Sequence, residues 1–155
     1  MKQLSFFAVV MIFILSSCTP TNKLLNTSKK PSIKFIENQT YEEVIAKAQA
    51  SGKPIMIDFY TTWCEPCKWL EQDVFQVKQV YTYYNDNVIN YKVNAENFDN
   101  IALAQQFEIA AYPTVIFLTQ DGDYITRQEG STTATNFINL GRNAVSTNGN
   151  SISLK

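Results

Sequence analysis

Residues 53–72 read KPIMIDFYTTWCEPCKWLEQ and form the most informative stretch of this chain. Ile55 to Tyr60 is a short apolar run typical of a buried strand, and WCEPC at residues 63–67 follows where a strand would give way to a helix. Pro66 suits a first helical turn, because its missing N–H would have no intrahelical partner there. Two intervening residues let the thiols of Cys64 and Cys67 form and reopen a disulfide with little backbone movement. The stretch therefore predicts a redox-active CxxC site.

The two cysteines have different predicted roles. Cys64 would lie at the helix N-terminus, where unpaired backbone amides favour the thiolate, so we expect it to be the nucleophile. Cys67, one turn further along, would be shielded and would resolve the mixed disulfide. Glu65 acts against the effect of the helix N-terminus on Cys64, because a nearby negative charge disfavours a thiolate. Lys68 offsets part of the effect of Glu65. With no His in the chain, a strongly acidic thiolate is not expected, and the pattern favours a reductant over an oxidant.

Two other interpretations of the CxxC pair are a fixed structural disulfide and half of a zinc site. A structural zinc ion usually takes four Cys or His ligands, whereas this chain has three Cys and no His. A disulfide across two residues closes so small a loop that it constrains the unfolded chain little. We therefore expect no metal and no cofactor other than the Cys64–Cys67 disulfide itself.

The chain resembles the thioredoxin-fold family. Within it, GKPIMIDFYTTWCEPCKWLEQDVF at residues 52–75 is most similar to the periplasmic thioredoxin-like domain of DsbD-type transmembrane thiol reductases. The likeness covers about Ile33 to Ala144 and implies an α/β thioredoxin fold, with a central mixed β-sheet flanked by helices, and a thiol:disulfide oxidoreductase activity. Glu65 departs from the Gly of thioredoxin, which leaves the redox potential open.

The resemblance also implies a proton carrier. Asp58, six residues before Cys64, matches the buried acid of thioredoxins, and Lys92 matches its lysine neighbour. A carboxylate among Ile, Met and Phe would be desolvated and its pKa raised, so it could accept the Cys67 proton through a water molecule. The alternative is an acid at a strand edge that faces solvent.

A substrate groove is implied by Tyr112-Pro113-Thr114, which matches the cis-proline motif of the family. A trans proline that only marks the start of a strand is the alternative. A cis bond would turn the backbone of Tyr112 toward Cys64 and present unpaired groups to an extended substrate chain. The predicted substrate-binding residues are Trp63, Glu65, Pro66, Tyr112 and Pro113.

The N-terminus resembles a bacterial lipoprotein signal. Lys2 precedes an apolar run from Phe6 to Leu15, and Cys18 follows two serines. The run is too short to span a bilayer comfortably, which favours a signal peptide cleaved after residue 17 and a lipid on the Cys18 sulfur. An ordinary secretory signal or an uncleaved short anchor are the alternatives. Residues 18–32 are polar and predict a tether, followed by a thioredoxin-like domain at 33–145 and a flexible tail at 146–155.

Hydrophobic periodicity and turn residues give the expected elements. Thr40 and Glu43 form a capping-box pattern before a helix at 41–50, and Asp121-Gly122 predicts a hairpin. The other expected elements are strands at 33–37, 88–93, 115–118 and 124–127, and helices at 77–84, 99–107 and 131–144.

The sequence thus predicts an exported, membrane-tethered enzyme that reduces or exchanges disulfides of cell-envelope proteins on the periplasmic side. An exported reductant must be re-reduced, and a DsbD-type membrane protein is the expected electron donor. The net charge of −1 gives no indication of nucleic-acid binding. The alternatives are a disulfide oxidant or isomerase, and a redox-inert peptide-binding module on the same scaffold.

Overall fold

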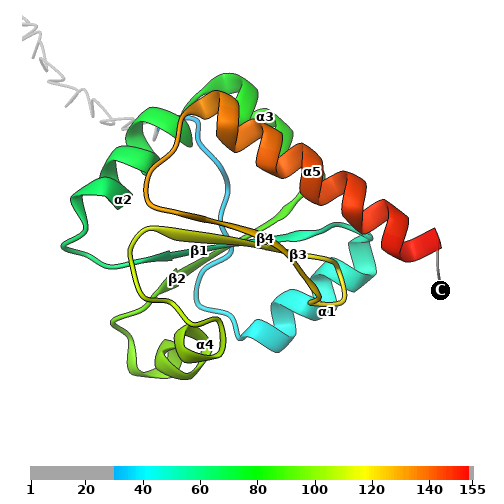
Figure 1. Ribbon diagram of the computed structural model, residues 1–155, viewed down its shortest axis with the longest axis horizontal. Helices are drawn as coiled ribbons and strands as arrows, with labels where there is room; N and C mark the ends of the chain where they lie inside the picture. Colours follow the sequence, from blue (N-terminus) through cyan, green and yellow to red (C-terminus); the bar gives the residue numbers. More distant parts are fainter. Residues whose placement is uncertain (1–29, 154–155) are drawn as a thin grey trace, which may run out of the picture.

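The computed structural model describes residues 30–153 (Figure 1). The predicted signal peptide, the lipidation of Cys18 and the tether up to residue 29 lie outside the described residues. None of the helices within residues 30–153 is both long and apolar enough to cross a membrane.

A single mixed sheet forms the centre of the molecule, with its strands in the order β2-β1-β3-β4. The strands are β1 (Ile55–Tyr60), β2 (Ile89–Asn94), β3 (Thr114–Leu118) and β4 (Tyr124–Glu129). β2 runs parallel to β1, whereas β3 runs antiparallel to both β1 and β4. The continuous apolar run of β1 suits a strand that is covered on both faces, and it is buried along almost its whole length.

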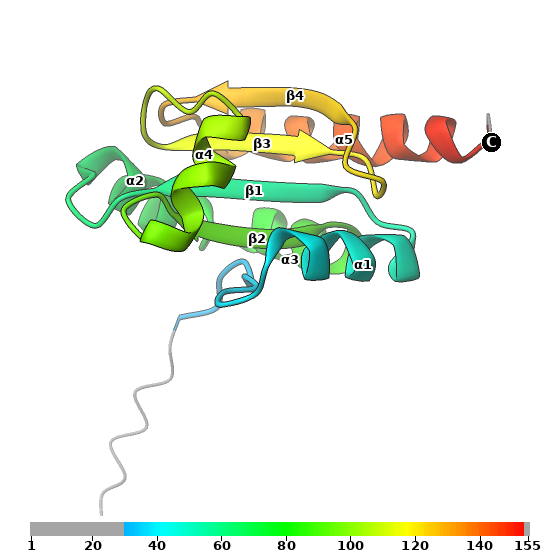
Figure 2. The same ribbon diagram turned by 90° about the horizontal axis from the view of Figure 1, so that it is seen from below.

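Helices cover both faces of the sheet (Figures 1 and 2). One face carries α1 (Tyr41–Ser51) and α4 (Ile101–Gln106), which follows the 3₁₀ turn η2 (Phe98–Asn100). The other face carries α2 (Glu65–Trp69), the π-helical turn η1 (Leu70–Val74), α3 (Lys78–Asn87) and α5 (Ala134–Ser153). Each face has its own hydrophobic core. This arrangement confirms the predicted α/β architecture of a mixed sheet flanked by helices.

The N-terminus of α1 confirms the predicted capping box. Thr40 Oγ1 accepts a hydrogen bond from the Glu43 N–H at 3.3 Å, and Glu43 Oε2 accepts one from the Thr40 N–H at 2.9 Å. Gly52 ends the helix with a φ of +68°, a left-handed conformation that glycine adopts without strain.

The strand predicted at residues 33–37 is wrong. Only Ile36 forms a bridge, a parallel one to Tyr91, while the N–H of Ile33 donates to the Phe75 carbonyl at 3.1 Å. The segment therefore crosses the edge of the sheet toward the η1 side instead of running along β2.

The flexible tail predicted at 146–155 is also wrong for residues 146–153, because α5 continues to Ser153. Buried Asn148 explains why the helix does not end near Ala144. Its amide donates to the Gly52 carbonyl at 3.0 Å and accepts from the Gln120 N–H at 2.7 Å. One polar side chain thereby ties α5 to the end of α1 and to the β3–β4 turn.

Candidate active site

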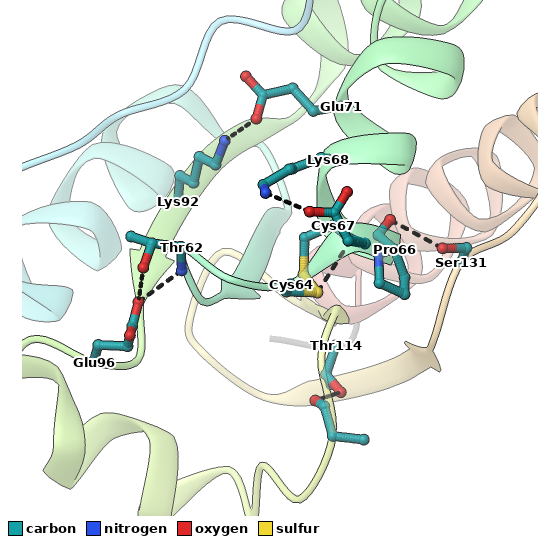
Figure 3. The surroundings of a disulfide bond; sticks show 12 residues. Thr62, Cys64, Pro66, Cys67, Lys68, Glu71, Lys92, Glu96, Thr114 and Ser131 are labelled. Atoms are coloured by element: carbon teal, nitrogen blue, oxygen red, sulfur yellow. Dashed lines mark hydrogen bonds and ion pairs between the residues drawn. A yellow bond between two sulfur atoms is a disulfide. The ribbon is translucent and has the colours of Figure 1, made fainter.

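Cys64 and Cys67 form a disulfide at the carboxyl end of β1, with their Cα atoms 5.3 Å apart (Figure 3). Cys64 is the N-cap of α2, and its Sγ accepts a hydrogen bond from the Cys67 N–H at 3.1 Å. A donor aimed at this sulfur stabilises negative charge on it, as the sequence-based role of Cys64 requires.

Both cysteines are buried, with 2% of Cys64 and 8% of Cys67 exposed. The sequence predicted shielding of Cys67 but not of Cys64. Burial therefore does not tell which cysteine is the nucleophile. The hydrogen bond that the Cys64 sulfur accepts is the feature that distinguishes Cys64 from Cys67.

The charge of Glu65 is paired at the rim of the site. Lys68 Nζ lies 2.6 Å from Glu65 Oε1, and both side chains are exposed. Glu65 thus has less influence on a Cys64 thiolate than an isolated carboxylate would have.

Asp58 lies in the middle of the sheet, only 3% exposed, beside Lys92 on β2 and Val115 on β3. Asp58 lies two residues after Met56, so the two side chains share one face of the sheet, and Met56 belongs to the core beneath α3 and α5. The Asp58 side chain therefore faces the α2 side of the sheet. Burial raises the pKa of Asp58 to about 7, with Lys92 lowering it and Glu71 raising it. Asp58 Oδ1 has no hydrogen-bond partner among the described residues. An acid that faces solvent at a strand edge, the alternative interpretation, does not describe this residue.

Lys92 forms an ion pair with Glu71, and its charge also acts on Asp58. Its Nζ lies 2.8 Å from Glu71 Oε2 (Figure 3). The same Nζ lies 4.7 Å from the centroid of the Tyr60 ring. Burial lowers the pKa of Lys92, but the hydrogen bond to Glu71 and the charges of Asp58 and Glu71 more than offset this, and the pKa is raised. Sequence reasoning missed Glu71. Its spacing of four residues from Cys67, which places both on one helix face, is the signal that could have found it.

Glu96 is a second residue that sequence reasoning missed. Its Oε2 accepts from the Thr62 N–H at 2.6 Å and from the Thr62 hydroxyl at 2.7 Å (Figure 3). The Thr62 backbone, the Thr62 hydroxyl and the Trp63 side chain all lower the pKa of Glu96. The loop that leads to Cys64 is therefore fastened to the loop that follows β2. No local sequence signal links these two loops.

The Tyr112–Pro113 peptide bond is cis. The ring of Tyr112 stands edge-on to that of Trp63, with centroids 6.2 Å apart, and Trp63 is 66% exposed. The N–H and C=O of Tyr112 form no hydrogen bond within the described part of the chain, whereas the Pro113 carbonyl accepts from the Gly130 N–H at 2.8 Å.

The turn before α5 is hydrogen-bonded both to the cis-proline segment and to α2. Gly130 bonds to Pro113, and the hydroxyl of the next residue, Ser131, donates to the Pro66 carbonyl at 3.0 Å (Figure 3). The structure thus brings Trp63, Glu65, Pro66, Tyr112 and Pro113 around the disulfide. Within residues 30–153, no three His, Cys, Asp or Glu side chains come together in a group that could hold a metal ion.

Comparisons with known proteins agree with this geometry. A family model described as a thioredoxin-like domain matches residues 41–144. The chain is 37% identical over 78 residues to the thiol:disulfide interchange protein DsbD of Salmonella typhi, and 34% identical over 96 residues to that of Yersinia enterocolitica. These matches cover 50% and 60% of this chain but 14% and 17% of the relatives, so the chain spans only a small part of their length.

Solved structures show the same architecture. A putative disulphide-isomerase from Bacteroides thetaiotaomicron is 29% identical, with a TM-score of 0.66 over 76% of this chain and 97% of that one. A thioredoxin from Thermus thermophilus is 22% identical, with a TM-score of 0.67 over 77% and 92%. The oxidised C-terminal domain of Neisseria meningitidis DsbD is also 22% identical, with a TM-score of 0.55 over 64% and 87%.

Proposed function

Because the chain belongs to the thioredoxin-like domain family and is a thiol:disulfide oxidoreductase, we propose that it reduces disulfides of cell-envelope proteins on the periplasmic side of a membrane. The likeness to part of DsbD supports a role in thiol:disulfide interchange. The lipoprotein-like start of the sequence supports export and a tether through a lipid on Cys18.

The observation that carries the reducing direction is the buried carboxyl group of Asp58 on the α2 side of the sheet. Glu71, one helical turn after Cys67, is paired with Lys92 and has less influence, as Glu65 has through its pairing with Lys68. Carboxylates disfavour a nearby thiolate, and a dithiol whose thiolate is not strongly stabilised gives up its electrons readily. The chain also has no His that could stabilise a Cys64 thiolate.

In the first step, the Cys64 thiolate attacks one sulfur of the partner's disulfide. A Cys64–partner disulfide forms, the partner's own S–S bond breaks, and the released partner thiolate takes up a proton from water. The partner's chain lies extended against Tyr112, whose free N–H and C=O hold it as an added strand, between Trp63 and the Glu65-Pro66 rim.

In the second step, Cys67 resolves the mixed disulfide. Asp58 takes the Cys67 proton through a water molecule, since a carboxylate with a pKa of about 7 accepts and returns protons near neutral pH. The Cys67 thiolate then attacks the Cys64 sulfur, and the second partner thiolate leaves and is protonated. The partner gains two electrons and two protons, and the chain is left with the Cys64–Cys67 disulfide. The positive charge of Lys92 lowers the pKa of Asp58 and so favours its ionised form.

The oxidised pair must then accept two electrons from another dithiol. We assign this role to a DsbD-type membrane protein, and the proposal includes no cofactor besides the Cys64–Cys67 pair. Cells that lack such a donor should accumulate the oxidised form, which thiol-specific alkylation of the protein in whole cells would reveal. Full reduction of the protein in those cells would contradict this assignment.

The decisive experiment is the reduction potential of the Cys64–Cys67 couple in residues 30–155, measured in glutathione and dithiothreitol buffers. We expect a value near the thioredoxin level of about −270 mV. A value near the DsbA level of about −120 mV would make the protein an oxidant and would overturn the argument from Asp58.

A disulfide isomerase is the second candidate, which the 29% identity to a putative disulphide-isomerase favours. The two candidates differ in whether the partner ends oxidised or reduced. Reactivation of scrambled ribonuclease that exceeds the rate of insulin reduction would favour the isomerase. A Cys64→Ser protein that retains full function would instead indicate a redox-inert binding module.

A further inference from the structure

A buried hydroxyl group without a hydrogen-bond partner lies on the segment that leads from β1 to Cys64. It belongs to Thr61, which is only 4% exposed, and its Oγ1 has no partner within residues 30–153. Thr114 and Thr119, which are also buried, both use their hydroxyls in hydrogen bonds. A buried hydroxyl that has lost its bonds to water normally gains a partner in the fold, so Thr61 is an exception beside the disulfide.

A tight turn holds Thr61 close to Cys64. The Cys64 N–H donates to the Thr61 carbonyl at 3.3 Å. A bond between residues three apart closes a β-turn and keeps the two Cα atoms within about 7 Å of each other. On its other side, the register of β1 and β3 leads Thr61 toward Tyr112, two residues beyond the Phe59–Thr114 pair. The hydroxyl is therefore enclosed within a side chain's reach of the Cys64 sulfur.

The redox state of the sulfurs decides whether this hydroxyl has an acceptor. In the disulfide, the Cys64 sulfur is neutral and already accepts from the Cys67 N–H at 3.1 Å. A neutral sulfur is a weak acceptor, whereas a thiolate accepts strong, charge-assisted hydrogen bonds. Reduction by a dithiol adds two electrons and two protons, breaks the S–S bond and frees Cys64 to ionise, while the dithiol becomes a disulfide. A hydroxyl can then rotate to meet the new acceptor.

We propose that the Thr61 hydroxyl donates a hydrogen bond to the Cys64 sulfur in the reduced protein and so stabilises the attacking thiolate. The inference rests on the proposed function, which assigns the first attack to Cys64. The thiolate then has two donors, the Cys67 N–H and the Thr61 hydroxyl. Because the hydroxyl is paired only after reduction, it favours the reduced form and moderates the reducing power of the pair.

The test compares Thr61→Val, which removes the hydroxyl but keeps the shape, with Thr61→Ser, which keeps the hydroxyl. Residues 18–155 with Cys18→Ser leave Cys64 and Cys67 as the only thiols. Alkylation of the reduced protein by iodoacetamide from pH 5 to pH 10, with mass spectrometry to identify the modified cysteine, gives the fraction of Cys64 thiolate. We expect this fraction at pH 7 to fall about 5-fold in Thr61→Val and to stay within about 2-fold of wild type in Thr61→Ser.

A second measurement reports on the oxidised form. The equilibrium with glutathione should shift toward the Cys64–Cys67 disulfide by about 3-fold in Thr61→Val, which corresponds to about 14 mV. Oxidised Thr61→Val should also unfold at a higher urea concentration than the oxidised wild type, because it buries no unpaired hydroxyl, whereas the reduced variant should not gain stability.

Thr119→Val is the matched control, since it removes a buried hydroxyl at the opposite end of β3. It should leave both the thiolate fraction and the glutathione equilibrium as in wild type. The charged groups around the sulfurs, which are Asp58, the Glu65–Lys68 pair and the Glu71–Lys92 pair, are the same in all these proteins. A difference between them therefore reports on the hydroxyl.

The outcomes separate this inference from the proposed function. Equal thiolate fractions in wild type and Thr61→Val would overturn the inference, and so would a Thr61→Ser protein that behaves like Thr61→Val. If the hydroxyl holds a buried water molecule instead, oxidised Thr61→Val would be less stable than wild type and its thiolate fraction unchanged, which also overturns it. Alkylation of Cys67 before Cys64 would instead contradict the role of Cys64 in the proposed function.

Discussion

Two regions of the molecule, the core between α3 and α5 and the strand β1, each bury a polar side chain. The two side chains differ in whether their polar atoms are hydrogen-bonded. In the first region, Tyr84 stacks on Phe137 with ring centroids 4.7 Å apart and donates to the Phe137 carbonyl at 2.6 Å. In the second, Asp58 is as deeply buried but has one carboxylate oxygen without a partner among the described residues. Buried polar groups are normally hydrogen-bonded. The unpaired Asp58 oxygen therefore marks the region where a titratable group lowers the stability of the fold.

The largest effect on this comparison should come from Asp58→Asn. The folded protein has an Asp58 pKa of about 7, against an ordinary value of 3.8, so the folded state keeps a proton that the unfolded state loses between these pH values. The stability of the oxidised wild type should therefore fall as pH rises from about 4 to about 7, by roughly 2–4 kcal/mol, and then stay level.

The variant should not show this fall and should be the more stable protein at pH 8. Urea unfolding at pH 4, 6 and 8 measures the difference, with Asp86→Asn as an exposed control. The same pH dependence in wild type and Asp58→Asn would show that Asp58 is not the group that costs stability.

Gly141→Ala should damage the well-packed region by about 3 kcal/mol. A Cβ on Gly141 would lie 2.8 Å from Cζ of Tyr84, a fully buried ring that is held by its stack and its hydrogen bond. Gly149→Ala is the matched control on the same helix, because a Cβ there meets no atom within 4 Å, and it should stabilise by up to about 1 kcal/mol. Thermal unfolding of both variants checks the opposite signs, and equal effects would disprove the close approach of Tyr84.

Tyr84→Phe should cost about 1 kcal/mol, because it removes one hydrogen bond to a backbone carbonyl but keeps the aromatic stack. This cost should be the same at pH 4 and pH 8, in contrast to that of Asp58. A cost that changes with pH over this range would mean that the two regions are coupled.

Glu71→Gln should have the smallest effect on the free energy of unfolding, at most about 1 kcal/mol. Glu71 raises the pKa of Asp58, and it also pairs with the Lys92 ammonium that lowers it. Its neutralisation should therefore move the Asp58 titration to lower pH and narrow the range over which stability falls. The carboxyl carbon signal of Asp58 in an NMR titration reports this midpoint directly. An unchanged or higher midpoint would argue against the Glu71–Lys92–Asp58 arrangement.

The parts of the fold that the sequence predicted are those with local signals. The apolar run of β1, the CxxC turn after it and the Thr40 capping box each depend on residues close together in the chain. The resemblance placed Lys92 beside Asp58, and the register of β1 and β2 sets them side by side.

The missed features all depend on contacts between distant segments. Glu71 faces Lys92 only because η1 packs beside β2, and Glu96 meets Thr62 only because two loops converge after parallel strands. Residues 33–37 have strand-like composition, but Ile33 bonds to Phe75 instead of continuing the ladder. The polar composition after residue 145 likewise gives no sign that Asn148 is buried. Its hydrogen-bond partners, Gly52 and Gln120, lie in distant parts of the sequence.

The position of Asn148 has a practical consequence for anyone who engineers this protein. A stop codon placed after Ala144, where the composition turns polar, would delete the amide that fastens Gly52 and the β3–β4 turn to α5. The shortened chain would keep every residue of the disulfide site and still lose the clamp at the opposite end of the sheet. Affinity tags, reporter fusions and immobilisation linkers therefore belong after Ser153, where they leave that clamp in place.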